Sequence, residues 1–399
     1  MERYSEYKDS GVKWLGEIPS HWELLKSKYL WKETFENSTS GKEDLLSVSQ
    51  YTGVTKSKAD SRSESLIGYK IVHKDDLVIN IMLAWLGGLG VSNDEGVVSP
   101  AYCTYKLIRD YNPKFLHYLY KTPMYLAEFA RHSTGVVPSR WRMYTDDFGQ
   151  VVSLLPPVEE QDAIVRYLDA ATSKIDKAIA MQQKMIDLLN ERKQIIIQNA
   201  VTKGLDENVE MKDSGVEWIG MIPKHWKICP FKRLIKIKNG ADYKKYEVQD
   251  NGFPVIGSGG VFAYSSKYAY DGESLLLGRK GTIDKPMYFK GKFWTVDTMF
   301  YGIPKDNADC KYLYYQALTI PFKLYATSTA IPSMTQTDLY NNPMCFPCKE
   351  EQKAIADYLD LAIKPFDSAI SNCQRQITLL QERKQIIINE VVTGKVKVS

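Results

Sequence analysis

An internal duplication constrains the fold of this 399-residue chain more than any other feature. Residues 9–22 read DSGVKWLGEIPSHW and residues 213–226 read DSGVEWIGMIPKHW, with 10 of 14 positions identical. Residues 159–202 match residues 350–393 without a gap, with 25 of 44 positions identical. Both copies of this longer segment contain EEQ, A-I-x-x-Y-L-D and ERKQIII. The chain therefore consists of two long half-chains and is not a short-period solenoid.

The regions between the repeated segments diverge. Residues 23–153 (module 1) and 227–342 (module 2) align only in patches, such as VPS at 137–139 with IPS at 331–333. Their apolar runs are short, rich in Val, Ile, Tyr and Phe, and interrupted by glycine, which predicts strands and turns. Examples are DLVINIMLAW at 76–85, ESLLLGRKG at 273–281 and KFWTVDTMFYG at 292–302. We interpret the repeated segments as a shared frame that carries two different modules.

The frame itself is predicted to be helical. Prolines precede each EEQ motif, and the acidic residues that follow them favour a helix from about residue 159. A separate long helix is expected from about residue 175 to about residue 200, with its repeat in the second copy. Each long helix has an apolar seam with alternating spacings of three and four, which favours a coiled coil over a single amphipathic core helix. The seam residues are Ile179, Ile186, Leu189 and Ile196 in the first copy and Ile370, Ile377, Leu380 and Ile387 in the second.

Isoleucine triplets at 195–197 and 386–388 exceed what one seam requires. They predict a further contact near each helix end, with a domain or a partner. Two narrow seams in one chain also favour packing of the two long helices on each other.

Several classes of protein are excluded by composition. The hydrophobic share of 44% and charged share of 25% are those of a globular protein. The longest apolar runs are too short for a membrane-spanning helix, and the N-terminus is charged from residue 2, unlike a signal peptide. Six cysteines are too few for a disulfide scaffold, so we expect a cytoplasmic protein without membrane partners.

A search for catalytic motifs finds no phosphate loop, no dinucleotide fingerprint and no adenine-methyltransferase signature. Cys345 and Cys348 have the spacing of metal ligands, but no second pair completes a site, so no metal is predicted. His21 and His225 occupy matching frame positions and are interpreted as structural. The E-x-K triplets at 191–193 and 382–384 resemble nuclease motifs but fall on the long helices, where a solvated helix face is the expected role.

The charge balance differs between the modules. Module 2 has 16 basic against 10 acidic residues, whereas module 1 has 16 against 15. Module 2 could therefore bind a phosphate backbone through its net charge, and module 1 would need a local cluster. Basic residues beside aromatic residues suit phosphates and base edges. The candidate DNA contacts are Lys56, Lys58, Ser139, Arg140 and Arg142 in module 1, and Tyr243, Lys244, Lys245, Arg279 and Lys280 in module 2.

With these motifs in their order, the chain resembles the specificity subunits of type I restriction-modification systems. The frame motif W-[LI]-G-x-I-P-x-H-W and the helix that contains ERKQ both occur twice. The runs NGADY at 239–243 and GRKGT at 278–282 are also typical of that family. The second copy departs from the pattern at Cys348, where the first copy has Pro157.

This resemblance implies an α+β fold in which two mixed α/β target recognition domains are separated by a pair of long antiparallel coiled-coil helices with pseudo-twofold symmetry. Each domain would read one half of a bipartite site in double-stranded DNA. The frame helices would set the spacing and dock two methyltransferase subunits, which restriction subunits then join. The chain would have no catalytic residues and bind no cofactor. S-adenosylmethionine, ATP and magnesium would be bound by the partners.

The predicted segments follow from the repeat and the resemblance. They are an N-terminal frame segment at 1–22, target recognition domain 1 at 23–153, a central frame region with a long helix at 154–226, target recognition domain 2 at 227–342 and a C-terminal frame region with a long helix at 343–399. Two alternatives remain at this point: a self-contained nuclease or methyltransferase of unrecognised type, and a coiled-coil scaffold that does not bind DNA. The N-terminal segment has no helix before it, so symmetry predicts that residues 9–22 lie near the end of the second long helix, around Thr393.

Overall fold

The computed structural model describes residues 2–57, 65–137, 140–325 and 332–398. They form two compact units: unit 1 comprises residues 1–182 and 375–399, and unit 2 comprises residues 183–374. Each unit contains one module and about half of each long helix. The units therefore divide inside the helices, and the five segments derived from the sequence stay a prediction.

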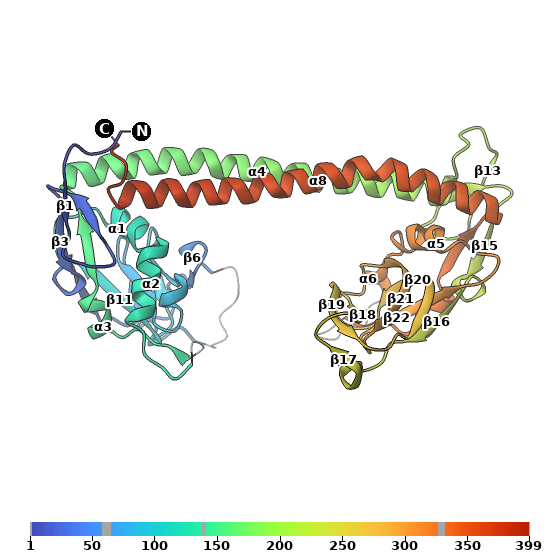
Figure 1. The fold of residues 1–399 in the computed structure, drawn as a ribbon, viewed down its shortest axis with the longest axis horizontal. Coiled ribbons are helices and arrows are strands. Elements are labelled where there is room, and N and C mark those ends of the chain that lie inside the picture. Colours follow the sequence, from blue (N-terminus) through green and yellow to red (C-terminus); the bar gives the residue numbers. More distant parts are fainter. Residues whose placement is uncertain (1, 58–64, 138–139, 326–331, 399) are drawn as a thin grey trace. The chain divides into compact units, whose positions relative to one another are not determined.

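Two long helices form the frame (Figure 1). Helix α4 spans Val158–Lys203 and helix α8 spans Lys349–Val392. The prediction of two separate helices in each copy is wrong, because each copy forms one uninterrupted helix. Residues 170–174 read AATSK and contain neither glycine nor proline, so nothing ends the first helix there. In α8, Pro365 lies inside the helix at an exposed position, where water can solvate the carbonyl that loses its partner.

Within each unit, α4 and α8 run antiparallel and are joined by equivalent ion pairs. In unit 1, Lys384 Nζ lies 2.7 Å from Asp176 Oδ1, and in unit 2, Lys193 Nζ lies 2.5 Å from Asp367 Oδ1. These pairs exchange places under the internal repeat, because both partners shift by 191 residues. The eight seam isoleucines and leucines predicted from the sequence are all buried or half-buried.

Module 1 is built on an antiparallel sheet with the strand order β4-β11-β8-β9. The pairs β5–β6 and β7–β10 form two separate two-stranded sheets, and β1–β2 and β3–β12 form two more on the frame side of unit 1. The strands are β1 (Tyr7–Asp9), β2 (Glu17–Pro19), β3 (Glu23–Lys26), β4 (Trp31–Thr34), β5 (Leu46–Ser49), β6 (Gly53–Lys56), β7 (Lys70–Val72), β8 (Leu77–Asn80), β9 (Leu89–Val91), β10 (Gly96–Val98), β11 (Tyr102–Leu107) and β12 (Val152–Leu155). The helices are α1 (Pro113–Tyr120), α2 (Pro123–Arg131) and α3 (Thr145–Gln150).

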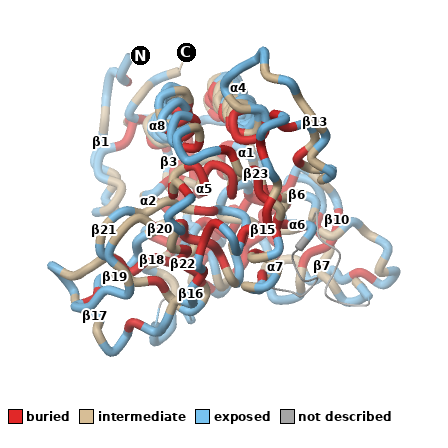
Figure 2. The backbone as a smooth tube through the Cα atoms, turned by 90° about the vertical axis from the view of Figure 1, so that its right-hand side faces the viewer, coloured by how far each residue is buried: buried red, intermediate tan, exposed pale blue. Residues whose placement is uncertain are grey.

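Module 2 contains a seven-stranded sheet with the order β16-β22-β20-β21-β18-β19-β17, in which only the β18–β21 pair is parallel. Figure 2 shows buried residues in red along its central strands. The strands of unit 2 are β13 (Met211–Asp213), β14 (Met221–Pro223), β15 (Lys227–Pro230), β16 (Ile235–Asn239), β17 (Glu247–Val248), β18 (Phe253–Gly257), β19 (Gly260–Ser265), β20 (Tyr270–Gly278), β21 (Met287–Thr295), β22 (Met299–Pro304) and β23 (Pro343–Phe346). The helices are α5 (Cys310–Ala317), α6 (Phe322–Tyr325) and α7 (Gln336–Asn341).

The strands expected in the modules are confirmed at β8, β20, β21 and β22. The short helices of the modules were not predicted individually, although local signals for them exist. Asn112 caps α1 and Thr122 caps α2, and each is followed by a proline at the first helical position. This Asn-Pro and Thr-Pro pattern is a recognised helix start.

The N-terminal segment closes the repeat, as symmetry predicts. Tyr7 donates a hydrogen bond to the carbonyl of Gly394 at 3.0 Å, and Glu2 bridges to Lys397. Gly394 has φ of +73°, and a Cβ there would lie 2.5 Å from Pro19 Cδ. Residues 9–22 therefore pack at the end of α8, which confirms their expected position. A glycine is needed at this turn for both its conformation and its closeness to Pro19.

Candidate nucleic-acid interface

The two modules share one contact beside the ends of their central strands. In module 1 the amide of Met143 donates to the carbonyl of Ile81 at 3.0 Å, and in module 2 the amide of Met334 donates to the carbonyl of Arg279 at 3.0 Å. Both methionines are buried. The loop after β8 or β20 therefore lies beside the segment that leads into α3 or α7. The predicted arginines of the two modules lie on different parts of this shared arrangement. Arg140 and Arg142 lie on the segment before α3 in module 1, and Arg279 lies on the loop after β20 in module 2.

Arg279 and Lys280 follow β20 and have different environments. The Arg279 guanidinium lies 5.9 Å from the Phe300 ring centroid and donates to the carbonyl of Asp297 at 3.2 Å. Lys280 is exposed. At the start of this loop, a Cβ on Gly278 would lie 2.2 Å from the carbonyl oxygen of Thr282, so only glycine fits the turn. The sequence GRKGT thus holds one arginine against an aromatic ring and leaves the adjacent lysine in solvent.

The loop with NGADY lies on the other side of the turn between β21 and β22. The amide of Ala241 donates to Thr295 O at 2.9 Å, and the amide of Arg279 donates to Thr298 O at 2.8 Å. Both predicted basic clusters of module 2 are therefore attached to the same short turn between β21 and β22. Gly240 is required for this approach, because a Cβ there would lie 2.0 Å from Val296 O.

Lys244 and Lys245 are exposed on this loop, whereas the Tyr243 ring is nearly buried. The Tyr243 ring packs edge-on against Phe262, with 5.6 Å between the centroids. Tyr243 thus supports the loop from beneath, and Lys244 and Lys245 present its charge.

Two lysines that were not predicted from the sequence extend this basic surface. Lys267 Nζ lies 4.5 Å from the centroid of the Tyr246 ring, and Lys292 Nζ lies 5.0 Å from that of Tyr268. Aromatic side chains with basic side chains over their rings suit the phosphate backbone and the faces of bases. Neither lysine belongs to a motif, and each meets its aromatic partner only through the fold.

Module 1 presents a more apolar surface at the equivalent place. Arg140 is exposed, and Arg142 pairs with Thr134 through its backbone and donates from its guanidinium to the carbonyl of Trp141 at 2.7 Å. The Trp141 ring contacts Trp85 edge-on at 5.3 Å between centroids. The contact between Trp85 and Trp141 therefore joins the segment after β8 to the segment that leads into α3.

The remaining candidates of module 1 are less informative. Lys56 Nζ lies 2.6 Å from Asp44 Oδ2, and this hydrogen bond raises the pKa of Lys56. Its charge is therefore locally paired. Lys58 and Ser139 lie outside the described residues.

The frame histidines hold each motif to the start of a long helix. His21 Nε2 lies 2.8 Å from Glu160 Oε2, and the indole of Trp22 donates to Glu160 Oε1 at 3.1 Å. In the second copy, Trp226 donates to Glu351 Oε1 at 3.0 Å, and His225 lies 3.1 Å from the other oxygen of that carboxylate. The glutamate of each EEQ motif thus accepts from both the histidine and the tryptophan of one frame motif, which supports the structural interpretation.

The other motifs weighed for chemistry occupy structural places. Cys345 is buried in β23 and Cys348 is exposed beyond it. Within the described ranges, no three His, Cys, Asp or Glu side chains are grouped to hold a metal ion. Lys193 and Lys384 of the E-x-K triplets form the ion pairs between α4 and α8.

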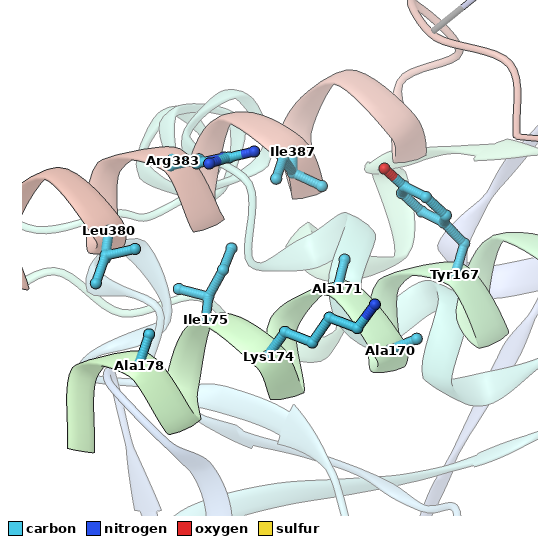
Figure 3. A pocket seen from close by; sticks show the side chains of 9 residues that line it. All are labelled: Tyr167, Ala170, Ala171, Lys174, Ile175, Ala178, Leu380, Arg383 and Ile387. Atoms are coloured by element: carbon cyan, nitrogen blue, oxygen red, sulfur yellow. The ribbon is translucent and has the colours of Figure 1, made fainter. Parts of the chain in front are cut away.

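A groove lies between α4 and α8 in unit 1, with a volume of about 450 Å³ (Figure 3). Small side chains form part of one wall, at Ala170, Ala171 and Ala178, and Leu380 and Ile387 face them. The second copy keeps alanine at two of the three equivalent positions, 362 and 369, but has leucine at position 361. The two copies therefore differ in this wall at Ala170, where the first copy has the smaller side chain.

A second apolar stripe runs along the outside of the frame helices. The exposed fractions are 51% for Leu188 and 53% for Ile195 in α4 of unit 2, and 53% for Leu379 and 55% for Ile386 in α8 of unit 1. In each triplet, two isoleucines are at least half-buried and the first is exposed to solvent. The exposed isoleucine leaves this side of the helix available to a partner.

Comparisons with known proteins agree with this architecture. The family model described as the type I restriction modification DNA specificity domain matches residues 223–381. The MjaVIII type I restriction enzyme specificity subunit of Methanocaldococcus jannaschii is 26% identical over 278 residues, or 61% of this chain and 62% of that one. A chain of the same organism, named as an MjaX type I restriction enzyme specificity subunit, is 24% identical over 96% of both chains.

A solved structure gives the same fold over nearly the whole chain. It comes from work on complex assembly and conformational transition of the type I R-M system, and the TM-score is 0.66 at 15% identity. The match covers 95% of this chain and 99% of that one. In the part of the chain that the structure describes, no helix is both long and apolar enough to cross a bilayer.

Proposed function

We propose that this chain, which belongs to the specificity-subunit family of type I restriction-modification systems, is the non-catalytic subunit that recognises the DNA sequence. The observation that carries this proposal is the repeated arrangement of loops on a duplicated frame. Each module joins its two candidate DNA loops through the same hydrogen bond, while the side chains on those loops differ. A shared scaffold with different loop residues suits a protein that reads two unlike half-sites.

The two modules would read DNA by different balances of contacts. Module 2 combines Arg279 with the lysines around Tyr246, which suits bidentate recognition of guanine together with phosphate contacts. Module 1 offers Arg140 beside an apolar surface that includes Val136, whose exposed fraction is 94%. Apolar side chains contact thymine methyl groups or open base steps. The half-sites should therefore differ in sequence.

The partners follow from the same proposal. The exposed stripe on the frame helices, present once in each copy, suits two copies of one methyltransferase subunit related by the internal twofold. Restriction subunits would join that complex. S-adenosylmethionine, ATP and magnesium would be bound by these partners, and the protein would act in the cytoplasm, where its DNA target is.

Reconstitution with the methyltransferase subunit of the same system tests this function. The complex should methylate one bipartite sequence, which sequencing of modified bases would identify. Replacing residues 23–153 with those of a relative should change one half-site and leave the other unchanged. A change in both half-sites, or none, would contradict the modular assignment.

The purified chain alone should transfer no methyl group from labelled S-adenosylmethionine to DNA. This control separates the proposal from a self-contained methyltransferase. Footprinting of the assembled complex should show protected bases that change when residues 23–153 are replaced, whereas a scaffold that does not bind DNA would leave the footprint unchanged.

A further inference from the structure

Each module is attached to its long helix by an aspartate, and the two aspartates occupy equivalent positions of the internal repeat. In unit 1, Asp169 accepts hydrogen bonds from Lys114 Nζ and the Tyr118 hydroxyl, both at 2.7 Å. In unit 2, Asp360 accepts from Lys311 Nζ and from the Tyr315 hydroxyl, the latter at 2.6 Å. Both aspartates end the A-I-x-x-Y-L-D motif of the frame, and both pairs of donors lie on the first helix after the main sheet of a module.

A buried glutamine completes the attachment on the same helix face. Gln161 accepts from the amide of Asn112 at 2.9 Å and donates to Pro156 O at 2.7 Å. Gln352 likewise accepts from the amide of Asp309 at 2.8 Å and donates to the carbonyl of Pro347 at 3.0 Å. The glutamine holds the start of α1 or α5, and the aspartate holds the next turns. Together they fix both ends of one short helix against α4 or α8.

The geometry of the carboxylate restrains rotation. The lysine and tyrosine are four residues apart, so they lie on one face of α1 or α5, one above the other. A carboxylate that accepts from both fixes the rotation of the module helix about its own axis, which one contact could not do. Burial alone would raise the pKa of Asp360, but hydrogen bonds from Lys311 and Tyr315 lower it overall, so the carboxylate stays charged.

The ion pairs alone do not explain why these contacts recur. Both Lys–Asp pairs are substantially exposed to solvent, where ion pairs contribute little to folding. The modules that supply the donors align only in patches, yet the donors are present in both. A shared requirement for a defined angle between module and helix accounts for this pattern.

We propose that Asp169 and Asp360 are positioning residues that fix each module on its long helix and thereby set the spacer length between the half-sites. The inference rests on the proposed function. Successive base pairs are about 3.4 Å apart along the duplex. A module that pivots enough to move its loops by about this distance would therefore accept a spacer one base pair longer or shorter.

The test uses the full chain reconstituted with its methyltransferase subunits. The substrates are duplexes that carry the wild-type half-sites with the native spacer, or with one base pair more or less. The variants are Asp169→Ala, Asp360→Ala and the milder Tyr118→Phe and Tyr315→Phe. Each alanine variant removes two hydrogen bonds, so discrimination against the altered spacers should fall roughly tenfold, while the preferred bases of each half-site stay the same. Asp360→Asn keeps an acceptor for Tyr315 and should restore part of the discrimination.

Two controls separate positioning from folding. Glu382→Ala removes the same charge from an exposed position of α8, and Ile355→Val trims the buried core of unit 2. Both should keep the spacer profile of the wild type. If an alanine variant fails to assemble, the phenylalanine variant of the same unit gives the answer.

Unchanged spacer discrimination in assembled variants would overturn the inference. Absence of sequence-specific methylation by the wild-type complex would instead overturn the proposed function. A loss of base preference together with spacer preference would assign these residues a general structural role and would also refute the inference.

Discussion

Arg279 and Lys280 are adjacent in the sequence, but the fold gives them different capacities. Arg279 is held against Phe300 and a backbone carbonyl, which leaves most of its donors free in a fixed orientation. The backbone of Lys280 is paired with that of Ser333, and the residue itself is exposed. A fixed guanidinium suits a base edge, and a mobile ammonium suits a phosphate.

Substitutions at these two positions should therefore have different effects. Arg279→Ala should cost about 1–3 kcal/mol of specific binding and relax one base position of the module 2 half-site. Lys280→Ala should weaken binding to all sequences and reduce the salt dependence by about one unit of slope. Equilibrium binding of the complex at several salt concentrations would measure both. Lys305, which follows the far end of β22, provides a matched control that should change neither.

His117 gives unit 1 a dependence on pH. Its imidazole lies against Gly53 and Gly90 and accepts a hydrogen bond from the amide of Val91 at 3.1 Å. Burial, together with the charges of Lys121 and Lys114, lowers the pKa of His117 to about 4. The imidazole therefore stays neutral in the folded protein well below the ordinary pKa of about 6.5.

The consequence is a loss of stability in weak acid. Between about pH 6.5 and about pH 4, the unfolded chain binds a proton at His117 that the folded chain does not. The free energy of unfolding should fall as the pH is lowered through this window, by up to about 1.4 kcal/mol per pH unit. Denaturant titrations at several pH values should show a smaller slope for His117→Gln than for the wild type. Equal slopes would contradict the assignment.

At the scale of elements, the frame helices present two different faces. The seam faces the partner helix, and the outer stripe repeats as Leu188, Arg192 and Ile195 in α4 and as Leu379, Arg383 and Ile386 in α8. The nearly equal exposure of the matching apolar residues indicates that each copy keeps the same surface open. These exposed apolar residues are the observation on which the proposed docking of a protein partner rests.

Blocking one stripe should remove one methyltransferase subunit. Leu188→Glu with Ile195→Glu should leave a complex with a single methyltransferase, and so should Leu379→Glu with Ile386→Glu. Affinity at the altered stripe should fall roughly 30-fold or more, as for central interface residues. Native mass spectrometry of the assembled complex would count the subunits. Lys184→Glu, on an exposed position of the same helix, should keep two, and two subunits bound to the fourfold variant would refute the assignment.

At the scale of the whole molecule, both long helices contain residues of both units. One heptad inserted after Gln182 in α4 and another after Gln374 in α8 would preserve the ion pairs inside each unit. Seven residues add about 10 Å of helix, or roughly three base pairs of duplex. Mapping of methylated sites should therefore show a spacer about three base pairs longer.

The helical twist of DNA provides a further check on this change. Three heptads inserted in each helix add roughly 32 Å, which is close to one turn of the duplex. On sites with a spacer lengthened to match, this variant should methylate DNA faster than the one-heptad variant, because both half-sites again face the same side. If the one-heptad and three-heptad variants both methylate sites with the original spacer at the wild-type rate, the helices do not set the spacing.

The two half-chains, the helical frame with its seams and the strands of the modules can all be predicted from the amino-acid sequence. These features are encoded by neighbouring residues: Ile179, Ile186 and their repeats lie at heptad spacing, and the gap-free match keeps that spacing in both copies. The sequence also indicated the glycine-rich loop that carries Arg279. The continuity of α4 was not predicted, because the apolar seam covers only the part of the helix that packs against the other long helix.

Contacts between residues far apart in the chain become visible only in the folded protein. The partners of Asp169 lie about fifty residues away in a module that aligns poorly with its counterpart, so no pattern predicts the contact. Lys267 contacts Tyr246 beside the paired strands β17 and β19, and Tyr243, which reads as a surface residue beside two lysines, turns inward against Phe262. Local spacing specifies an element and its exposed face, but contacts between distant segments depend on how the elements pack, which is a property of the whole fold.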